Sequence, residues 1–370
     1  MAATFAAPVG FQVFRMTYYA MLVPNTALAK EAGRANWAQG VRYLSNFVGP
    51  YWLWIPLSVL AVLVALRVSG DLQAGQPLRA LAVVAPVAAG AVDAVYVVGV
   101  GGDFMHARML LPAMFAICRP VPSFRVPRGS TVTMALAVAL AGWALVCGIR
   151  LRPQDVTRFR FGDKTLTAYA TSDGRIDDER RSAVHFTGHH NPITVHDWAK
   201  LGDDGLRLRQ MAGSDHRGLF VTDAFLTKEY PLRHDLATPV VATSPAAGVA
   251  AYAAGPDVTM VDPLGLGDPI GSHLELRRRG RPGHEKLLDR AWIIARYAPP
   301  DFQSQDASLR TAVDDARHAV RCGALRRLLR DVTTPLGPAS ILTNLTDSFS
   351  NTAVRLPWEP GNARAQLCGP

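Results

Sequence analysis

The chain has 370 residues, 49% of them hydrophobic, with a formal net charge of +9 and a sequence pI of about 9.7. The charge is uneven: residues 1–150 hold four acidic and eleven basic residues, whereas residues 151–370 hold 26 and 28. Basic residues that flank apolar segments are typical of a membrane protein, while a nucleic-acid-binding protein carries them as a stripe on a soluble face. The composition therefore argues against a nucleic-acid partner, and the length allows two domains.

The first segment, Met1–Phe14, is apolar but too short for a membrane span, and no basic n-region of a signal peptide precedes it. We expect it to be the end of a longer helix whose start is missing. The following run holds Tyr18, Tyr19, Asn25 and Lys30. A tyrosine pair, a Pro-Asn turn and a lone lysine suit a sugar-phosphate site. Tyrosine also anchors helices at membrane interfaces, and spacing alone favours that interpretation.

Four apolar stretches are candidates for crossing a bilayer, namely residues 51–66, 80–100, 109–118 and 131–149. A full crossing needs about 20 apolar residues. The first and third stretches fall short of this length, and Pro112 interrupts the third. We expect the third stretch to be re-entrant or packed inside protein, because irregular backbone is tolerated at membrane depth only where protein or a cavity surrounds it.

Loops on the cytoplasmic side of a membrane are enriched in Lys and Arg. Basic residues lie between the first two stretches and between the last two, at Arg67, Arg79, Arg119, Arg125 and Arg128. This pattern places Gly101–Arg108 and everything after Arg150 outside the cytoplasm. We therefore expect residues 1–150 to form a multi-span helical membrane domain and residues 151–370 to form a soluble extracytoplasmic domain.

The second half has the pattern of an α/β domain. Short apolar runs bounded by Ser-Pro and Gly-Pro predict strands at Pro239–Thr243, Val249–Ala253 and Val258–Val261. Amphipathic spacing predicts a helix over Glu285–Tyr297 and one or two more within Ala307–Val332. The Asp-Pro pairs and glycines of residues 261–269 predict a tight loop, and the basic run of residues 277–281 predicts a solvated one.

The polar run Gly101–Arg108 is the strongest candidate for chemistry, because Asp, His and Arg at the membrane surface are costly without partners or purpose. If the run becomes helical after its glycines, Asp103 and His106 share a face. Arg108 can bind a phosphate with two hydrogen bonds, and His106 can move a proton or bind a sugar hydroxyl. A buried polar cluster that joins two helices is an equal alternative.

The histidines and cysteines give weaker signals. His185, His189, His190 and His196 lie near Asp197, but Gly188 and Pro192 favour a loop of hydrogen-bonding histidines over a metal site. Cys118 and Cys147 lie in apolar segments and are interpreted as small buried residues. Cys322 and Cys368 can form a disulfide if the second half lies outside the cytoplasm. We therefore predict no metal site.

Several of these runs together resemble the terminal β-(1→2)-arabinofuranosyltransferase family of actinobacterial cell-wall arabinan synthesis. The similar runs keep their order along nearly the whole chain: residues 14–19, 22–30, 37–40, 43–47, 101–106, 177–181, 187–189, 261–262, 265–266, 283–284, Lys286, and the surroundings of Cys322 and Cys368. No single run is decisive, but the ordered set is specific.

The resemblance implies the C-terminal part of a GT-C-type membrane fold that transfers arabinofuranose from decaprenyl-phosphate-arabinose to arabinan. The acceptor ends belong to arabinogalactan and lipoarabinomannan, and donor and acceptor lie outside the plasma membrane. The family carries further spans before residue 14, with an acidic residue in an early outer loop. We therefore expect an N-terminally incomplete chain, with Asp103 and His106 as supporting catalytic residues and Arg108, Asn25, Lys30, Tyr18 and Tyr19 as substrate-binding residues.

Two other functions remain open from the sequence. A non-catalytic, membrane-anchored glycan-binding or scaffold protein would keep the outer domain without needing the 101–108 run. A hydrolase built on the histidine cluster would require a metal. No cofactor is implied beyond the polyprenyl-phosphate sugar donor, and the residues leave the need for a divalent ion open.

Overall fold

The structure is a computed structural model that describes residues 2–124, 131–149, 157–161, 164–168, 175–177, 199–214, 216–223, 226–245 and 247–369. The chain divides into two compact units, one made of Met1–Ala32 with His189–Pro370 and the other of Gly33–Gly188. This division differs from the boundary expected at residue 150, because the first 32 residues pack with the C-terminal part. Each unit is described by itself.

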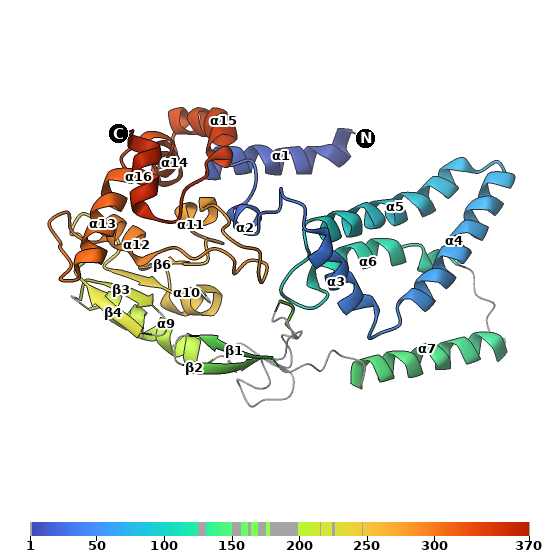
Figure 1. Cartoon of the computed structure of the whole chain (residues 1–370). Coiled ribbons are helices and arrows are strands. Elements are labelled where there is room, and N and C mark those ends of the chain that lie inside the picture. The colour runs from blue at the N-terminus through green and yellow to red at the C-terminus, as the bar shows by residue number, and fades with distance from the viewer. Residues whose placement is uncertain are drawn as a thin grey trace. The chain divides into compact units, whose positions relative to one another are not determined.

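The Gly33–Gly188 unit is mainly helical (Figure 1). Its elements are α3 (Trp37–Val48), α4 (Trp54–Gln73), α5 (Pro77–Gly99), η1 (Arg108–Leu110), α6 (Leu111–Cys118), η2 (Val121–Ser123), α7 (Thr131–Ile149), and an antiparallel pair of strands, β1 (Thr157–Phe161) and β2 (Lys164–Ala168). Helices α3 and α5 meet closely at Gly40, where a Cβ atom would lie 1.7 Å from the carbonyl oxygen of Val98. Only glycine permits this approach, and it sets the position of α3 against α5.

Two helices of this unit, α4 and α5, are long and apolar enough to cross a membrane. Only 11% and 22% of their most apolar 18-residue windows are buried. The core helix of a soluble protein would bury such a surface, so the exposure favours a lipid environment. Among the described residues, the apolar helices within Arg108–Cys118 and Met134–Gly148 are shorter.

The bounds expected for the first span are wrong. Helix α4 begins at Trp54 and continues past residue 66 to Gln73, so Arg67 lies within it. The guanidinium of Arg67 pairs with Asp71 one turn further along, at 2.9 Å. Charges four residues apart on a helix neutralise each other, which allows the helix to continue through them.

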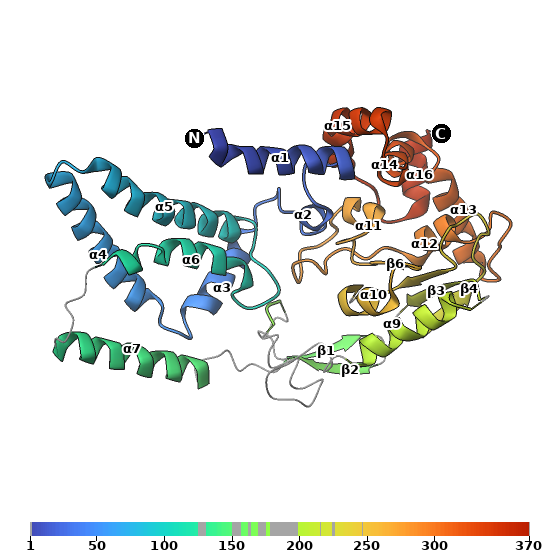
Figure 2. The same cartoon turned by 180° about the vertical axis from the view of Figure 1, so that it is seen from behind.

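The other unit contains a four-stranded sheet with the order β4-β3-β5-β6. Strands β3 (Gly218–Asp223), β5 (Val240–Thr243) and β6 (Val258–Val261) run parallel, and β4 (Leu226–Tyr230) is antiparallel to β3 at the edge. All four residues of β5 are buried. Helices α9 (Ala199–Ala212) and α10 (Ala247–Ala254) cover one side of the sheet and α12 (Arg290–Tyr297) the other (Figures 1 and 2).

The structure confirms the strands expected near residues 239–243 and 258–261, but the one expected at Val249–Ala253 is wrong. That segment lies in α10. Strands β5 and β6 are parallel, so the chain needs a crossover between them, and a helix is the usual one. The segment is rich in alanine, which has the highest helix propensity.

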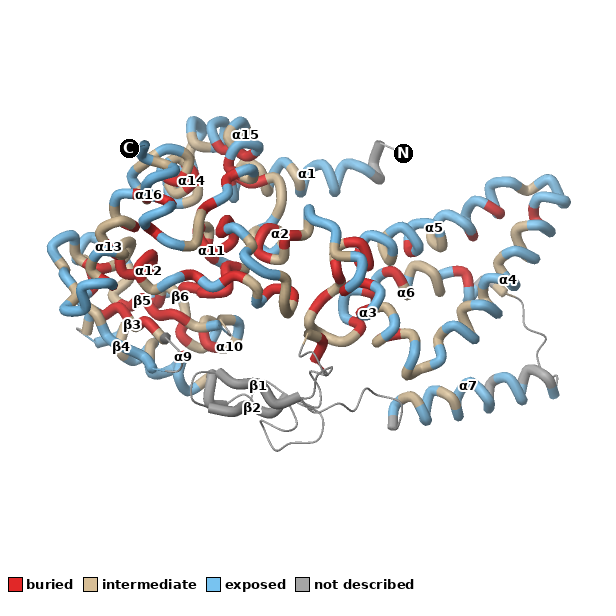
Figure 3. Tube along the Cα trace, in the orientation of Figure 1, coloured by how far each residue is buried: buried red, intermediate tan, exposed pale blue. Residues whose placement is uncertain are grey.

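The remaining helices of this unit are α11 (Pro269–His273), α13 (Ala307–Ala319), α14 (Gly323–Thr333), α15 (Pro338–Ala353) and α16 (Pro360–Cys368). They confirm two helices in residues 307–332. The helix expected to begin at Glu285 begins only at Arg290, because Asp289 caps it by accepting a hydrogen bond from the Ala291 amide at 2.7 Å. The buried centre lies along β5, β6 and α12, where Trp292 is fully buried (Figure 3).

The N-terminal helices belong to the same unit. Helix α1 (Ala2–Tyr19) packs against α15, and α2 (Asn25–Ala29) packs against α11. A disulfide joins Cys322 to Cys368 and so links the start of α14 to the end of α16. The sequence analysis gives this pairing for a domain that lies outside the cytoplasm.

Candidate functional site

The loop of residues 101–107 is irregular, so the condition under which Asp103 and His106 would share a helix face is not met. Gly101 and Gly102 have φ angles of 96° and 70°, and Ala107 has a φ of 62°. Gly102 lies against the ring of Tyr43, where a Cβ atom would be 2.3 Å from Cγ. Left-handed backbone and this close approach favour glycine and exclude a regular helix.

Tyr43 of α3 holds both ends of this loop. Its hydroxyl donates to the carbonyl of Met105 at 2.9 Å and accepts from the amide of Met109 at 3.1 Å. The side chain is fully buried, and burial raises the pKa of its phenol well above the usual value. Tyr43 therefore stays neutral and acts as a fixed structural anchor for the candidate site.

Asp103 and Arg108 form an ion pair within the loop. The Asp103 side chain is completely buried, whereas that of Arg108 is 44% exposed. The Arg108 guanidinium also lies 5.4 Å from the centre of the Phe104 ring. A buried carboxylate needs a cationic partner. The Asp103 carboxylate fixes the Arg108 guanidinium, and the exposed part of the Arg108 side chain stays open to a ligand.

His106 is held by two side chains that the sequence analysis did not assign to the site. Its Nδ1 lies 2.6 Å from Oδ1 of Asn46, and its Nε2 lies 2.9 Å from the hydroxyl of Tyr51. The amide oxygen can only accept, so Nδ1 donates to it, and in a neutral ring Nε2 accepts from the tyrosine hydroxyl. This arrangement fixes the ring's orientation and tautomer.

Backbone contacts with residues 176–177 complete the loop. The amide of His106 donates to the carbonyl of Asp177 at 2.9 Å, and the amide of Asp177 donates to the carbonyl of Phe104 at 2.6 Å. Asp177 begins one of the runs that resemble the arabinofuranosyltransferase family. Asp103, His106 and Arg108 are thus brought together by elements from three parts of the Gly33–Gly188 unit.

The other expected site residues lie in the unit of residues 1–32 and 189–370, which contains the four-stranded sheet and is called the sheet-containing unit below. Tyr18 and Tyr19 end α1 with exposed rings that pack on each other and on Phe14. Asn25 is the first residue of α2, and Lys30 follows its last. The structure therefore groups these residues separately from Asp103, His106 and Arg108.

The segment after α2 is fixed by a second, fully buried ion pair. The ammonium of Lys286 lies 2.7 Å from the Glu31 carboxylate, and the two side chains are 1% and 6% exposed. The same ammonium donates to the carbonyls of Leu28 and Ser272 at 3.0 and 2.9 Å. It therefore bonds the last turns of α2 and α11, where unpaired carbonyls need donors.

Lys30 itself lies beside the basic loop of residues 277–281 and its continuation. A Cβ atom on Gly283 would lie 3.2 Å from Cε of Lys30, and Arg279 donates to the Lys30 carbonyl at 3.4 Å. Arg279 also pairs with Glu285 at 3.5 Å, and its side chain is 25% exposed. The expected solvated loop is therefore found at Arg277 and Arg278, which are exposed, whereas Arg279 is ordered against the segment after α2.

Two buried polar groups next to this region serve the fold. Asp262 accepts from the amides of Leu264 and Gly267 at 2.9 Å, as expected for a tight loop, and burial raises its pKa. His273 is fully buried, and burial lowers its pKa to about 4. Its Nε2 lies 3.0 Å from the carbonyl of Asn351.

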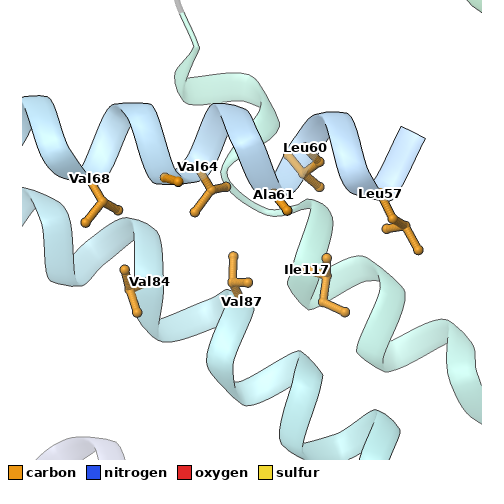
Figure 4. A pocket seen from close by; sticks show the side chains of 9 residues that line it. Leu57, Leu60, Ala61, Val64, Val68, Val84, Val87 and Ile117 are labelled. Carbon is orange, nitrogen blue, oxygen red and sulfur yellow. The ribbon is translucent and has the colours of Figure 1, made fainter. Parts of the chain in front are cut away.

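An apolar groove of about 400 Å³ lies between α4, α5 and α6 (Figure 4). Leu60 and Val64 of α4 point toward Val87 of α5 and Ile117 of α6. The groove offers no group for acid–base chemistry or ion binding. No group of three potential metal ligands exists among the residues that the structure describes. The cluster of His185, His189, His190, His196 and Asp197 lies outside them.

Comparisons with known proteins agree with the motifs. Residues 227–357 match the model of the AftB family C-terminal domain. The chain is 30% identical, over 95% of its length, to the terminal β-(1→2)-arabinofuranosyltransferase of Mycobacterium tuberculosis. It is 29% identical, over 93% of its length, to the protein of the same name from Corynebacterium glutamicum.

The chain spans 62% and 53% of the lengths of these two relatives. No solved structure shows significant similarity to it. The family resemblance seen in the ordered sequence motifs is nonetheless confirmed by two relatives that match almost every part of the chain. Residues 227–357 thus match the AftB family C-terminal domain, and the chain is similar over nearly its whole length to terminal β-(1→2)-arabinofuranosyltransferases.

Proposed function

We propose that this chain is part of a membrane glycosyltransferase that transfers arabinofuranose from decaprenyl-phosphate-arabinose to the non-reducing ends of cell-wall arabinan. The acceptors are arabinogalactan and lipoarabinomannan, and the new linkage is β-(1→2). The observation that carries this proposal is the similarity, over 95% and 93% of the chain, to two proteins named for that linkage and sugar. The exposed apolar helices α4 and α5 support it, because a polyprenyl-linked donor resides in the bilayer.

The proposal includes a multi-pass GT-C-type arrangement in the plasma membrane. The loop of residues 101–108 and the AftB family C-terminal domain lie on the outer side. This orientation rests on the basic residues between the apolar stretches, which mark the cytoplasmic side. The disulfide between Cys322 and Cys368 supports an oxidising compartment for the C-terminal domain.

Within the proposed site, Arg108 binds the phosphate of the donor. Its guanidinium is fixed by the buried Asp103 carboxylate, and the Arg108 side chain remains 44% exposed, so further N–H donors can reach a ligand. His106 binds a sugar hydroxyl or moves a proton, with its ring oriented by Asn46 and Tyr51. Asp103 then acts by positioning Arg108.

The substrate-binding roles of Asn25, Lys30, Tyr18 and Tyr19 are part of the same proposal. Lys30 is held beside Arg279 and Gly283, which gives this region a positive charge suited to an anionic group. The exposed rings of Tyr18 and Tyr19 can stack on sugars or lie in the membrane interface.

The test is transfer by membranes that contain this chain within the complete transferase, supplied with polyprenyl-phosphate-arabinose and a synthetic arabinan acceptor. We expect a product whose new terminal residue is β-(1→2)-linked, identified by linkage analysis. The same membranes carrying His106→Ala should transfer more slowly. Binding of arabinan without any transfer would instead support the non-catalytic, glycan-binding function, and unchanged turnover in His106→Ala would remove His106 from the site.

A further inference from the structure

Helix α15 buries three polar side chains and exposes its largest apolar ones, together with Thr343, Thr346 and Ser350. Asn344, Ser348 and Asn351 share one face of the helix and are buried, each at most 1% exposed. Leu342 and Phe349 lie on the outer surface, 64% and 61% exposed. A helix on the surface of a soluble domain shows the opposite pattern, with its apolar stripe facing the core.

The buried polar face is occupied by the end of α1. The amide of Asn344 donates to the carbonyl of Thr17 at 2.8 Å, and the amide of Asn351 donates to the carbonyl of Ala20 at 3.3 Å. The Thr352 hydroxyl accepts from the amide of Leu22 at 2.9 Å. These bonds satisfy backbone groups at and just after a helix end, so the polar side chains of α15 have a defined partner and the outward apolar face follows from it.

The apolar surface continues from α15 onto α1, which packs directly against it. The rings of Phe5, Phe11 and Phe14 on α1 are 65%, 58% and 46% exposed. The only charged residue of α1 is Arg15. Tyr18 and Tyr19, at the end of α1, are exposed aromatic residues of the type that occupies the layer between lipid tails and water.

Charge on α15 is also suppressed. Among its 16 residues the single ionisable one is Asp347, whose carboxylate lies 3.3 Å from the Arg330 guanidinium on α14. An exposed helix of a soluble protein normally carries several free charges opposite its buried face. The pairing lowers the cost of bringing Asp347 near a medium of low dielectric constant.

We propose that the outer face of α15 rests in the interfacial layer of the lipid bilayer, beside α1. This surface consists of Ile341, Leu342 and Phe349 of α15 with Leu336 just before the helix, all 43% to 64% exposed. A helix that lies in the interface buries its apolar residues at the boundary of headgroups and acyl chains. The contact seats the sheet-containing unit on the membrane, and it does not depend on the proposed transfer reaction.

The test uses spin labels on the full chain in vesicles of phosphatidylcholine and phosphatidylglycerol. Cys118 and Cys147, the free cysteines among the described residues, are replaced by serine, and the Cys322–Cys368 disulfide is kept. A nitroxide is attached at Leu342→Cys or at Phe349→Cys, so that the second variant can still be measured if the first does not fold. The matched control is Thr311→Cys, an exposed position on α13 of the same unit.

Collisions of the nitroxide with oxygen, which concentrates in the bilayer, are compared with collisions with a water-soluble nickel chelate. We expect the ratio of oxygen to nickel accessibility to be several-fold higher at residues 342 and 349 than at residue 311. Equal ratios at all three positions would overturn the proposal, because the surface would then face water. Poor access of both reagents to residues 342 and 349 would also overturn it, because a protein, such as a second copy of the chain, would then cover the surface.

Discussion

Two of the ion pairs that contain a buried carboxylate differ in what happens to the cation. Asp103 is completely buried while its partner Arg108 is 44% exposed. Glu31 and Lys286 are both buried, and the Lys286 ammonium has two further acceptors on α2 and α11. The difference shows that a buried carboxylate does not by itself mark a ligand-binding site. The cation that remains accessible is the group available to a ligand, and the cation enclosed by acceptors serves the fold.

The largest expected effect is on the enclosed pair. Lys286→Met leaves Glu31 buried without its counter-charge, and breaking a buried pair in this way costs about 3–5 kcal/mol. Chemical unfolding of the detergent-solubilised chain, followed through the sheet-containing unit, measures this loss. The double variant Glu31→Gln with Lys286→Met removes both charges and should recover part of it. Equal stability of Lys286→Met and the wild type would contradict a structural role for the pair.

The next effect concerns His273, whose pKa is lowered to about 4 by burial. The unfolded chain takes up a proton on this ring near pH 6.5, and the folded chain does so only near pH 4. The unfolded state therefore binds more protons between these values, and stability falls as the pH drops through this window, by up to about 3 kcal/mol.

Unfolding free energies measured between pH 7 and pH 4 test this dependence, with His273→Gln as the control that lacks a titrating ring. We expect a weaker pH dependence in the control. Identical slopes would mean that burial does not lower the pKa of His273. A stronger pH dependence in the control would mean that the folded ring is protonated, with Nδ1 and Nε2 donating to the carbonyls of Pro269 and Asn351, 2.6 and 3.0 Å away.

For the accessible pair, the effect falls on activity. Arg108→Lys keeps the charge beside Asp103 but loses the planar guanidinium that binds phosphate with two hydrogen bonds. We expect kcat/KM for transfer to fall about 10- to 100-fold, which corresponds to roughly 1.5–3 kcal/mol for a hydrogen bond to a charged group. Transfer kinetics and thermal unfolding of the same preparation separate a loss of rate from a loss of fold.

The smallest expected effect is at Tyr51, whose hydroxyl meets Nε2 of His106 at 2.9 Å. Tyr51→Phe removes one hydrogen bond of about 1 kcal/mol, so we expect a roughly fivefold lower kcat/KM. Tyr252→Phe on α10 is the control, because this ring is 85% exposed and far along the chain. Equal rates for the two variants would show that the orientation of His106 does not matter.

Sequence patterns predicted the strands and helices whose apolar residues follow a regular spacing along the chain. Strands β5 and β6 and helices α13 and α14 follow from apolar runs and amphipathic spacing. Tertiary context decided the exceptions: the parallel pairing of β5 with β6 required a helix at Ala247–Ala254, and the Asp289 cap delayed α12. Helix α4 runs past Arg67 because Asp71 neutralises it, a pairing visible in the sequence as an i, i+4 spacing.

The sequence analysis proposes Asp103, His106 and Arg108 for the candidate site, but it does not propose the side chains that hold them in place. Asp103, His106 and Arg108 were identified because charged groups near a membrane are costly, but the glycine backbone made the loop irregular. Tyr43 and Asn46 lie three residues apart on α3, a spacing that could have marked a shared polar face. The link to Tyr51 depends on the turn after α3. The buried polar side chains of α15 could not be predicted without knowing that the end of α1 packs against them.

The most direct test of the difference between the two pairs is the binding of a polyprenyl monophosphate to the chain in lipid nanodiscs, measured by native mass spectrometry. Arg108→Lys is compared with Arg277→Lys, because Arg277 also pairs with a carboxylate and lies over an aromatic ring, that of Trp358 at 4.8 Å, but its partner Glu359 is 65% exposed. We predict weaker binding by Arg108→Lys and unchanged binding by Arg277→Lys. Equal affinities in the wild type and both variants would contradict the assignment of Arg108 as the phosphate-binding cation.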